Sequence, residues 1–533
     1  MCSYLPVRLE ILLSGYGLAA MPGVHFNPEA AALSTRRTRL AFTLAAALCP
    51  ALAQLPPPDD QAPAEPQMVD LNVVALDSRG DPVTDLRPDE LRVTDNAKPQ
   101  AIAFFHHREA APGRPPAPAA GEFTNRGPAN IPRATLILFD LMNESFGTRG
   151  TSANQLVHEL ASLETADYVY LYILRLDGRL YPVHGLPGPE DRPPSPGDAP
   201  WTHQIKPLLD NALRTVQQLR PVDTDVAVRA QLTMRALDAI AADLSRVPGY
   251  KSIVWVTDGV PLVLGPRRSD TGDFVDFTPL IRQMSEAFNR SRVSIYPVRQ
   301  VMLGSADNVD GAAHDGMESI ETLSLFANLT GGRPDVGKDI GAAVRQAIID
   351  MRTSYQLGYC PPARNWDNKL HKLRVTCTRK GVRIQSKTGY YAWEDPPGAR
   401  GAQAIESIAR ATFDAAEIGL QAKLSGSSGG LVHLDAHIDL RDLALVRSGD
   451  FYDGHLRLAV VGYAQGELSQ RTPIIPLDLH FTSQAHDQAL QQGISFSQDL
   501  NVSKAIRSVR LIVFDRGSDS VGSLTIPVPP VGR

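Results

Sequence analysis

The segment Thr135-Leu-Ile-Leu-Phe-Asp140 is a run of apolar residues that ends in a carboxylate. A continuous apolar run, without polar alternation, is typical of a strand buried on both faces of a parallel sheet. Similar runs occupy Tyr168–Leu174 and Ser252–Val256, and helical segments such as Val226–Leu244, with apolar residues at helical spacing, lie among them. These alternating units predict an α/β fold whose central sheet is open, doubly wound and mostly parallel, with helices on both faces.

Strands of another kind flank this α/β unit, which we place at residues 133–352. Alternating residues at Met68–Leu76 and two further strand-like segments predict a small β module over residues 67–109. Strand-like segments also predict a β meander over residues 353–393 and a β-sandwich over residues 419–533. Two arrangements remain open: residues 67–109 and 353–393 form one sandwich with the α/β unit inserted, or they form two separate modules.

The N-terminal region is typical of an exported chain. Arg36, Arg37 and Arg39 precede a short apolar run, Leu40–Ala53, that ends in Ala-Leu-Ala, as in a secretory signal peptide. A run of this length is too short to span a bilayer. We therefore expect a signal peptide at 1–53, cleavage near Ala53, a mature chain without a transmembrane segment, and a periplasmic or extracellular location. Proline-rich composition predicts linkers at 54–66 and 110–132, and a further linker is expected at 394–418.

The composition excludes several classes of protein. The chain has 533 residues, of which 43% are hydrophobic and 21% charged, as in an average soluble protein rather than a disordered one. Lys and Arg number 53 against 58 Asp and Glu, a formal charge of −5 that provides no general attraction to nucleic acid. A multidomain, slightly acidic protein remains.

Cys360 and Cys377 are the cysteines that lie beyond the predicted cleavage site. Two thiols in an oxidising compartment can pair, which makes them a candidate disulfide. The alternative is a pair of free thiols, because a tight hairpin between them would place Cys360 opposite about residue 372 rather than Cys377.

A set of short motifs carries a family resemblance. The motifs are Val83-Thr-Asp-Leu86, Phe104-Phe105, Leu136-Ile-Leu-Phe-Asp-Leu-Met-Asn143, Lys251-Ser-Ile-Val-Trp-Val-Thr-Asp-Gly259, Leu329-Thr-Gly-Gly332, Ser354-Tyr-Gln-Leu-Gly-Tyr359 and Lys387-Thr-Gly-Tyr-Tyr391. In order and spacing they resemble the von Willebrand factor A-related proteins exported by acidobacteria, over roughly residues 67–393. The resemblance implies a central, Rossmann-like domain of the von Willebrand A type. It also implies a divalent-cation site on the loops at the carboxyl edge of its sheet.

The resemblance assigns the metal-site residues one by one. Asp140 matches the first acidic ligand and Thr257-Asp258-Gly259 the third loop, whereas Met142 replaces a serine ligand, and a thioether does not suit Mg²⁺. Candidate substitutes are Asn143 and Ser145, with Thr224 for the second loop. We therefore expect a degenerate metal-ion-dependent adhesion site without a physiological metal. Bound Mg²⁺ is one alternative; another is that Asp140 merely caps its loop.

No motif in the sequence indicates catalysis. Gly426-Ser-Ser-Gly-Gly430 fits the spacing of a nucleophile elbow, but it lies in a turn between predicted strands. Gly332–Lys338 fits the spacing of a phosphate-binding loop, but it follows a predicted helix, whereas such a loop follows a strand. We expect an exported, non-enzymatic protein of the binding or adhesion type, without a certain cofactor. Its partner would be an unidentified protein of the cell envelope or extracellular matrix. The alternatives are a structural envelope scaffold with an inactive A domain, or an unrecognised hydrolase.

Overall fold

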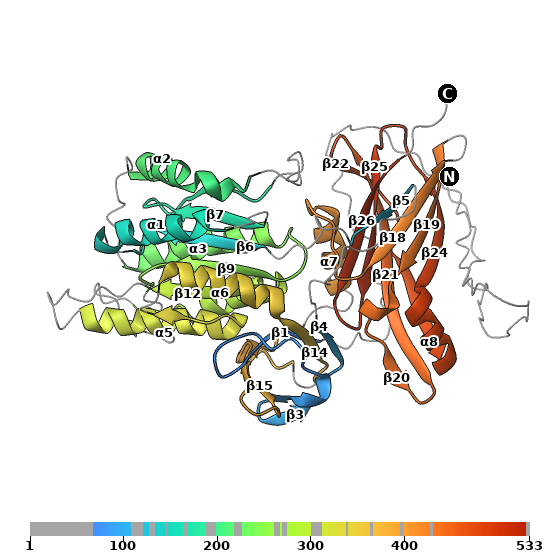
Figure 1. Cartoon of the computed structure of the whole chain (residues 1–533), viewed down its shortest axis with the longest axis horizontal. Helices are drawn as coiled ribbons and strands as arrows, with labels where there is room; N and C mark the ends of the chain where they lie inside the picture. Colours follow the sequence, from blue (N-terminus) through green and yellow to red (C-terminus); the bar gives the residue numbers. More distant parts are fainter. Residues whose placement is uncertain are drawn as a thin grey trace, which may run out of the picture.

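The computed structural model describes residues 68–107, 121–126, 134–144, 146–163, 168–187, 199–217, 226–260, 267–268, 274–299, 312–336, 339–362, 366–394, 399–426 and 430–528. The predicted signal peptide and the linker at 54–66 lie outside these residues. Figure 1 shows three structural units: a central unit in which helices cover a sheet, a small sandwich below it and a C-terminal sandwich beside it. A separate two-stranded hairpin joins β10 (Arg267–Arg268) to β11 (Phe274–Val275).

The predicted fold class is wrong. Strand accounts for 39% of the described residues and helix for 30%, and of the six sheets in the described residues five contain only antiparallel pairs. The chain is therefore mostly β, and it is not built as a Rossmann-like α/β protein of the von Willebrand A type around a doubly wound parallel sheet. The physical reason is that the segments flanking the central unit pair antiparallel with one another, in part between distant regions of the chain, and together contribute most of the described strands.

The central unit, residues 134–353, contains the single mixed sheet of the described chain. Its strand order is β13-β12-β9-β6-β7-β8. The strands are β6 (Thr135–Asp140), β7 (Val169–Leu174), β8 (Leu180–His184), β9 (Lys251–Val256), β12 (Val293–Arg299) and β13 (Asp335–Val336). All neighbours are parallel except β7 and β8. Strand β8 runs back along β7 because the chain reverses at Gly178, whose φ of +80° suits glycine.

Helices cover both faces of this mixed sheet. One face packs against α1 (Phe146–Ala161), α2 (Ile205–Gln217) and α6 (Ile340–Thr353), and the other against α3 (Val226–Leu244), α4 (Thr278–Arg290) and α5 (Ala312–Thr330). The predicted helix at Val226–Leu244 is confirmed with the same bounds. Side chains alternate along β6, so that Leu136 and Leu138 enter one core and Ile137 and Phe139 the other. A strand buried on both faces therefore explains the unbroken apolar run of the sequence.

The small sandwich consists of two four-stranded sheets, in the orders β16-β1-β14-β4 and β17-β15-β2-β3. Its strands are β1 (Val69–Leu76), β2 (Leu91–Asp95), β3 (Lys98–Gln100), β4 (Phe104–His107), β14 (Tyr355–Tyr359), β15 (Leu370–Cys377), β16 (Arg383–Gln385) and β17 (Gly389–Tyr391). Leu71 pairs with Leu357 in one sheet and Val93 with Val375 in the other. Segments on both sides of the central unit thus share both sheets, and the central unit is inserted between them.

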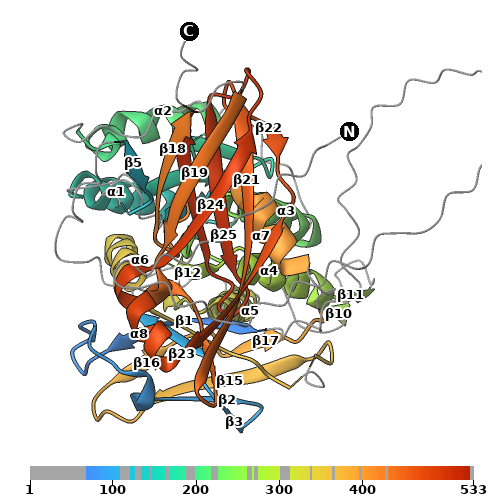
Figure 2. The ribbon, with the colours of Figure 1, turned by 90° about the vertical axis from the view of Figure 1, so that its right-hand side faces the viewer.

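The C-terminal sandwich faces the viewer in Figure 2. One sheet has the order β24-β19-β18-β5, and the other contains β20, β21, β25 and β26, with β22 and β23 paired to β21. The strands are β5 (Glu122–Thr124), β18 (Leu420–Gly426), β19 (Leu431–Ile438), β20 (Val446–Ser448), β21 (Phe451–Ala464), β22 (Glu467–Arg471), β23 (Ile475–Thr482), β24 (Ile494–Asn501), β25 (Ser508–Asp515) and β26 (Val521–Pro527). Helix α8 (Ser483–Gln492) follows β23, and α7 (Ala399–Ala409) lies on the sheet of β21 and β25, inside the expected linker.

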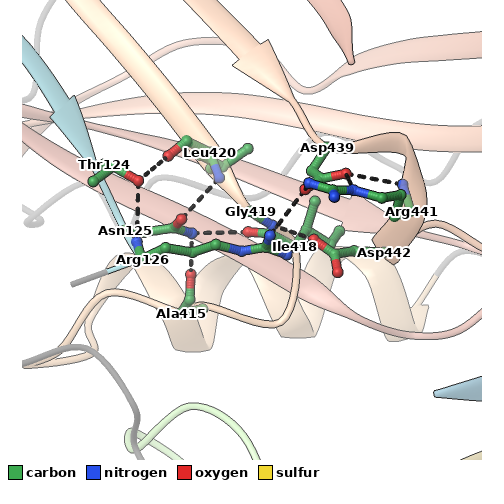
Figure 3. Close-up of polar contacts among 10 residues, drawn as sticks. All are labelled: Thr124, Asn125, Arg126, Ala415, Ile418, Gly419, Leu420, Asp439, Arg441 and Asp442. Atoms are coloured by element: carbon green, nitrogen blue, oxygen red, sulfur yellow. Dashed lines mark hydrogen bonds and ion pairs between the residues drawn. The ribbon is translucent and has the colours of Figure 1, made fainter. Parts of the chain in front are cut away.

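Strand β5 comes from the expected linker at 110–132 and pairs with β18, which lies almost 300 residues later in the chain. Figure 3 shows how the next two residues hold it in place. The Asn125 amide is fully buried; its Nδ2 donates to the carbonyls of Ala415 (2.7 Å) and Ile418 (2.8 Å), and its Oδ1 accepts from the backbone N–H of Leu420 (2.8 Å). Arg126 forms ion pairs with Asp439 and Asp442. The C-terminal sandwich therefore incorporates a strand from the N-terminal half of the chain.

The candidate disulfide between Cys360 and Cys377 is not formed, because both thiols are free in the structure. Cys360 follows β14 in one sheet of the small sandwich, whereas Cys377 ends β15 in the other and pairs with Leu91. The two residues therefore belong to different layers rather than to facing positions of one hairpin.

None of the described helices combines the length and apolar character needed to cross a membrane.

Candidate functional site

Of the predicted metal-site residues, Asp140 and Asn143 lie at the carboxyl end of β6, and Asp258 follows the neighbouring strand β9. The Asp140 carboxylate is fully buried. Oδ1 accepts a hydrogen bond from the backbone N–H of Asn143 (3.0 Å). Oδ2 accepts three, from Asn143 Nδ2 (2.8 Å), Trp255 Nε1 (3.0 Å) and Thr257 Oγ1 (3.1 Å). Asp140 therefore caps the loop that follows β6 and holds β9 against it.

These contacts do not fit a cation bound at Asp140. A hard cation needs carboxylate oxygens with lone pairs directed at it, and three donors already engage Oδ2. Burial raises the pKa of Asp140 above its ordinary value, which further weakens it as a ligand. Among the residues that the structure describes, no group of three or more His, Cys, Asp or Glu side chains is placed to hold a metal ion.

The remaining predicted residues are only partly brought together. Asn143 is buried beside Asp140, and half-buried Asp258 is near enough to raise the pKa of Glu144. Ser145 and Thr224 lie outside the described residues. The sequence did not predict the contributions of Trp255 and of Thr233 on α3, whose Oγ1 accepts a 2.8 Å hydrogen bond from Asn143 Nδ2. The position of Trp255 in a predicted buried strand could have indicated a contact of this kind, because a buried indole N–H normally requires a hydrogen-bond acceptor.

Glu144 is a second buried carboxyl group at this edge. Ser152 Oγ donates to Oε1, while Oε2 has no hydrogen-bond partner among the described residues. Burial raises the pKa of Glu144 to about 7; the Ser152 hydrogen bond opposes this, and the charges of Asp258 and Asp140 add to it. The neutral form of Glu144 therefore predominates in the folded protein below about pH 7, well above the range in which an ordinary glutamate is neutral.

We expect Glu144→Gln to stabilise the protein above pH 7 and to change its stability little at pH 4.5. The folded-state pKa of about 7 exceeds the ordinary 4.5, so the folded state binds the proton more tightly and wild-type stability falls as pH rises between these values. At about 1.4 kcal/mol per pH unit, the loss amounts to about 3 kcal/mol. Urea unfolding of the wild type and of Glu144→Gln at pH 4.5 and pH 8.5 measures this loss of stability. Glu467→Gln, at an exposed position of β22, should follow the wild type, and equal destabilisation of Glu144→Gln at both pH values would refute the argument.

A different polar cluster lies at the opposite, amino-terminal end of the central sheet and is centred on Arg292. Its Nη1 donates to both carboxylate oxygens of Glu417 (2.7 Å each), and its Nη2 to the carbonyl of Asp519 (2.7 Å). Its Nε lies 3.0 Å from Asp70 Oδ2, and its guanidinium lies over the ring of Tyr250. Asp70 belongs to the small sandwich, whereas Glu417 and Asp519 belong to the C-terminal part of the chain. One arginine therefore joins all three units, and no sequence motif marked it.

A cavity of about 460 Å³ lies beside Arg292, between the three units. Its walls include Asn72 from β1, Lys251 from the start of β9, Lys387 from the loop before β17, and Arg400 from α7. Burial lowers the pKa of Lys251 to about 7 and that of Lys387 to about 8. We call this space the junction cavity.

Comparison with known proteins identified no relative. No protein-family model matches the chain, and no curated protein matches it.

Proposed function

We propose that this chain is an exported, non-enzymatic binding protein of the cell envelope or exterior that recognises its protein partner without a metal ion at Asp140. The observation that carries the proposal is the engagement of Asp140 Oδ2 by Asn143, Trp255 and Thr257. Adhesion through a metal requires an ion with an open coordination position for an acidic group of the partner. Export and the von Willebrand factor A-related relationship are part of the proposal and rest on the sequence motifs.

A structural scaffold of the envelope is the second candidate, and the Arg292 cluster favours it. Arg292 and Glu417 are both largely buried, and their ion pair connects the central unit to the C-terminal sandwich while Asp70 adds the small sandwich. Such a junction suits a protein that holds three units in a constant arrangement. The two candidates differ in whether an envelope component binds to the chain.

Capture from a detergent extract of the cell envelope tests the proposal. We expect immobilised chain 54–533 to retain a discrete component equally well in EDTA and in Mg²⁺, and Asp258→Ala to retain the same component. Melting of the chain in both buffers should give the same midpoint, since an ion that binds only the folded state would raise it.

Two results would go against it. Retention that disappears in EDTA and in Asp258→Ala would mean that a metal at this edge mediates binding. Retention of nothing beyond what the heat-denatured chain retains would favour the scaffold.

A further inference from the structure

Two lysine side chains in the junction cavity lack a carboxylate partner. Lys387 makes no side-chain hydrogen bond or ion pair with any residue that the structure describes. Lys251 Nζ donates to the carbonyl of Val247 at 2.7 Å and forms no ion pair within the described chain. By contrast, Arg292 is paired with Glu417, and Arg400 with Asp519. With both lysines protonated, the cationic side chains of the cavity wall exceed the carboxylates by one; the cations are Lys251, Arg290, Arg292, Lys387 and Arg400, and the carboxylates are Asp70, Glu286, Glu417 and Asp519.

The Asn72 amide provides an independent observation in the same cavity. Asn72 is only 7% exposed, lines the cavity, and both its Nδ2 and its Oδ1 lack a hydrogen-bond partner among the described residues. Native proteins leave few buried amides unsatisfied, because a buried polar group without a hydrogen-bond partner has lost its contacts with water and gained nothing in return. A bound molecule with polar groups would remove this cost.

The size and walls of the cavity suit a small organic molecule. Its volume of about 460 Å³ lies within the usual range for ligand sites, which often form between structural units. Aromatic side chains line it, among them Tyr390, Tyr391 and Trp393. A second hollow also has Glu286, Arg290 and Trp393 in its wall, so these three side chains lie between the two spaces.

We propose that the junction cavity binds a small organic molecule with one carboxylate, which Lys387 and Lys251 recognise while the aromatic side chains pack against its body. A single negative charge fits better than a phosphate, because Asp70, Glu417 and Asp519 also line the cavity and would repel a more highly charged ligand. The site is independent of the proposed partner binding, since it lies at the opposite end of the central sheet from Asp140.

Isothermal titration calorimetry of chain 54–533 with benzoate tests this proposal. We expect benzoate to bind and its neutral analogue benzamide to bind about tenfold more weakly or not at all. Lys387→Met should weaken benzoate binding about tenfold, the effect of one lost charge-assisted hydrogen bond. Lys372→Met, which removes an exposed lysine of β15, should leave it unchanged.

The pH dependence provides a test without a variant, in case Lys387→Met fails to fold. The charged groups facing Lys387 are Asp70, Glu286, Arg292 and Arg400. Because the pKa of Lys387 is lowered to about 8, benzoate should bind more weakly at pH 9.5 than at pH 7. Equal binding of benzoate and benzamide, equal affinity at both pH values, tighter binding of inorganic phosphate, or no heat at millimolar benzoate would each overturn the proposal.

Discussion

Asn125→Leu is expected to lower the free energy of unfolding of the C-terminal sandwich by about 2–6 kcal/mol. The substitution removes both donors and the acceptor of the Asn125 amide, so that the carbonyl of Ile418 and the N–H of Leu420 lose this partner, whereas the carbonyl of Ala415 still accepts from the N–H of Ser523. Each buried polar group left unsatisfied costs about 1–3 kcal/mol. Differential scanning calorimetry should show the transition of this sandwich at a lower temperature.

The matched control is Asn501→Leu, at an exposed position of β24 in the same sheet. Surface substitutions of this kind usually change stability by less than about 0.5 kcal/mol. If the two variants melt together, β5 is not held by Asn125 and the C-terminal sandwich folds independently of residues 121–126. The same reasoning predicts that a fragment beginning at residue 399 is less stable than the sandwich in the whole chain.

Arg292→Met is expected to destabilise the chain by about 3–5 kcal/mol, the usual cost of removing one partner of a buried ion pair. The Glu417 side chain is only 3% exposed, so it would remain in the interior without its cation, together with Asp70. Chemical unfolding followed by tryptophan fluorescence measures the loss. Loosening of the junction should also increase proteolysis between the units.

Arg410→Met is the matched control for this prediction. Arg410 pairs with Glu406 on the surface and its side chain is 61% exposed, so its loss should cost less than about 1 kcal/mol. The double variant Arg292→Met, Glu417→Gln should regain part of the lost stability, because it removes the unpaired charge. Equal stability of Arg292→Met and Arg410→Met would show that the junction does not depend on this ion pair.

The candidate site shows where prediction from the sequence stopped. The motifs brought Asp140 and Asn143 to one loop, and the structure places them together. They did not predict that Trp255 and Thr257 would donate hydrogen bonds to Oδ2 of Asp140, because these contacts depend on how β9 lies against β6. The Arg292 cluster carried no signal at all, since its partners Asp70 and Glu417 lie far away in the sequence.

The sequence by itself determined the local structure wherever burial leaves a periodic pattern. The unbroken apolar run of β6 and the helical spacing of α3 depend on neighbouring residues, and both elements form where predicted. Only the tertiary structure decided which strands pair and, with them, the fold class. Strand β5 is three residues long, lies in a segment rich in Pro and Gly, and owes its place to β18 and Asn125. Pairing is a contact between distant segments, and its hydrogen bonds use backbone groups that every residue carries, so no local pattern specifies the partner.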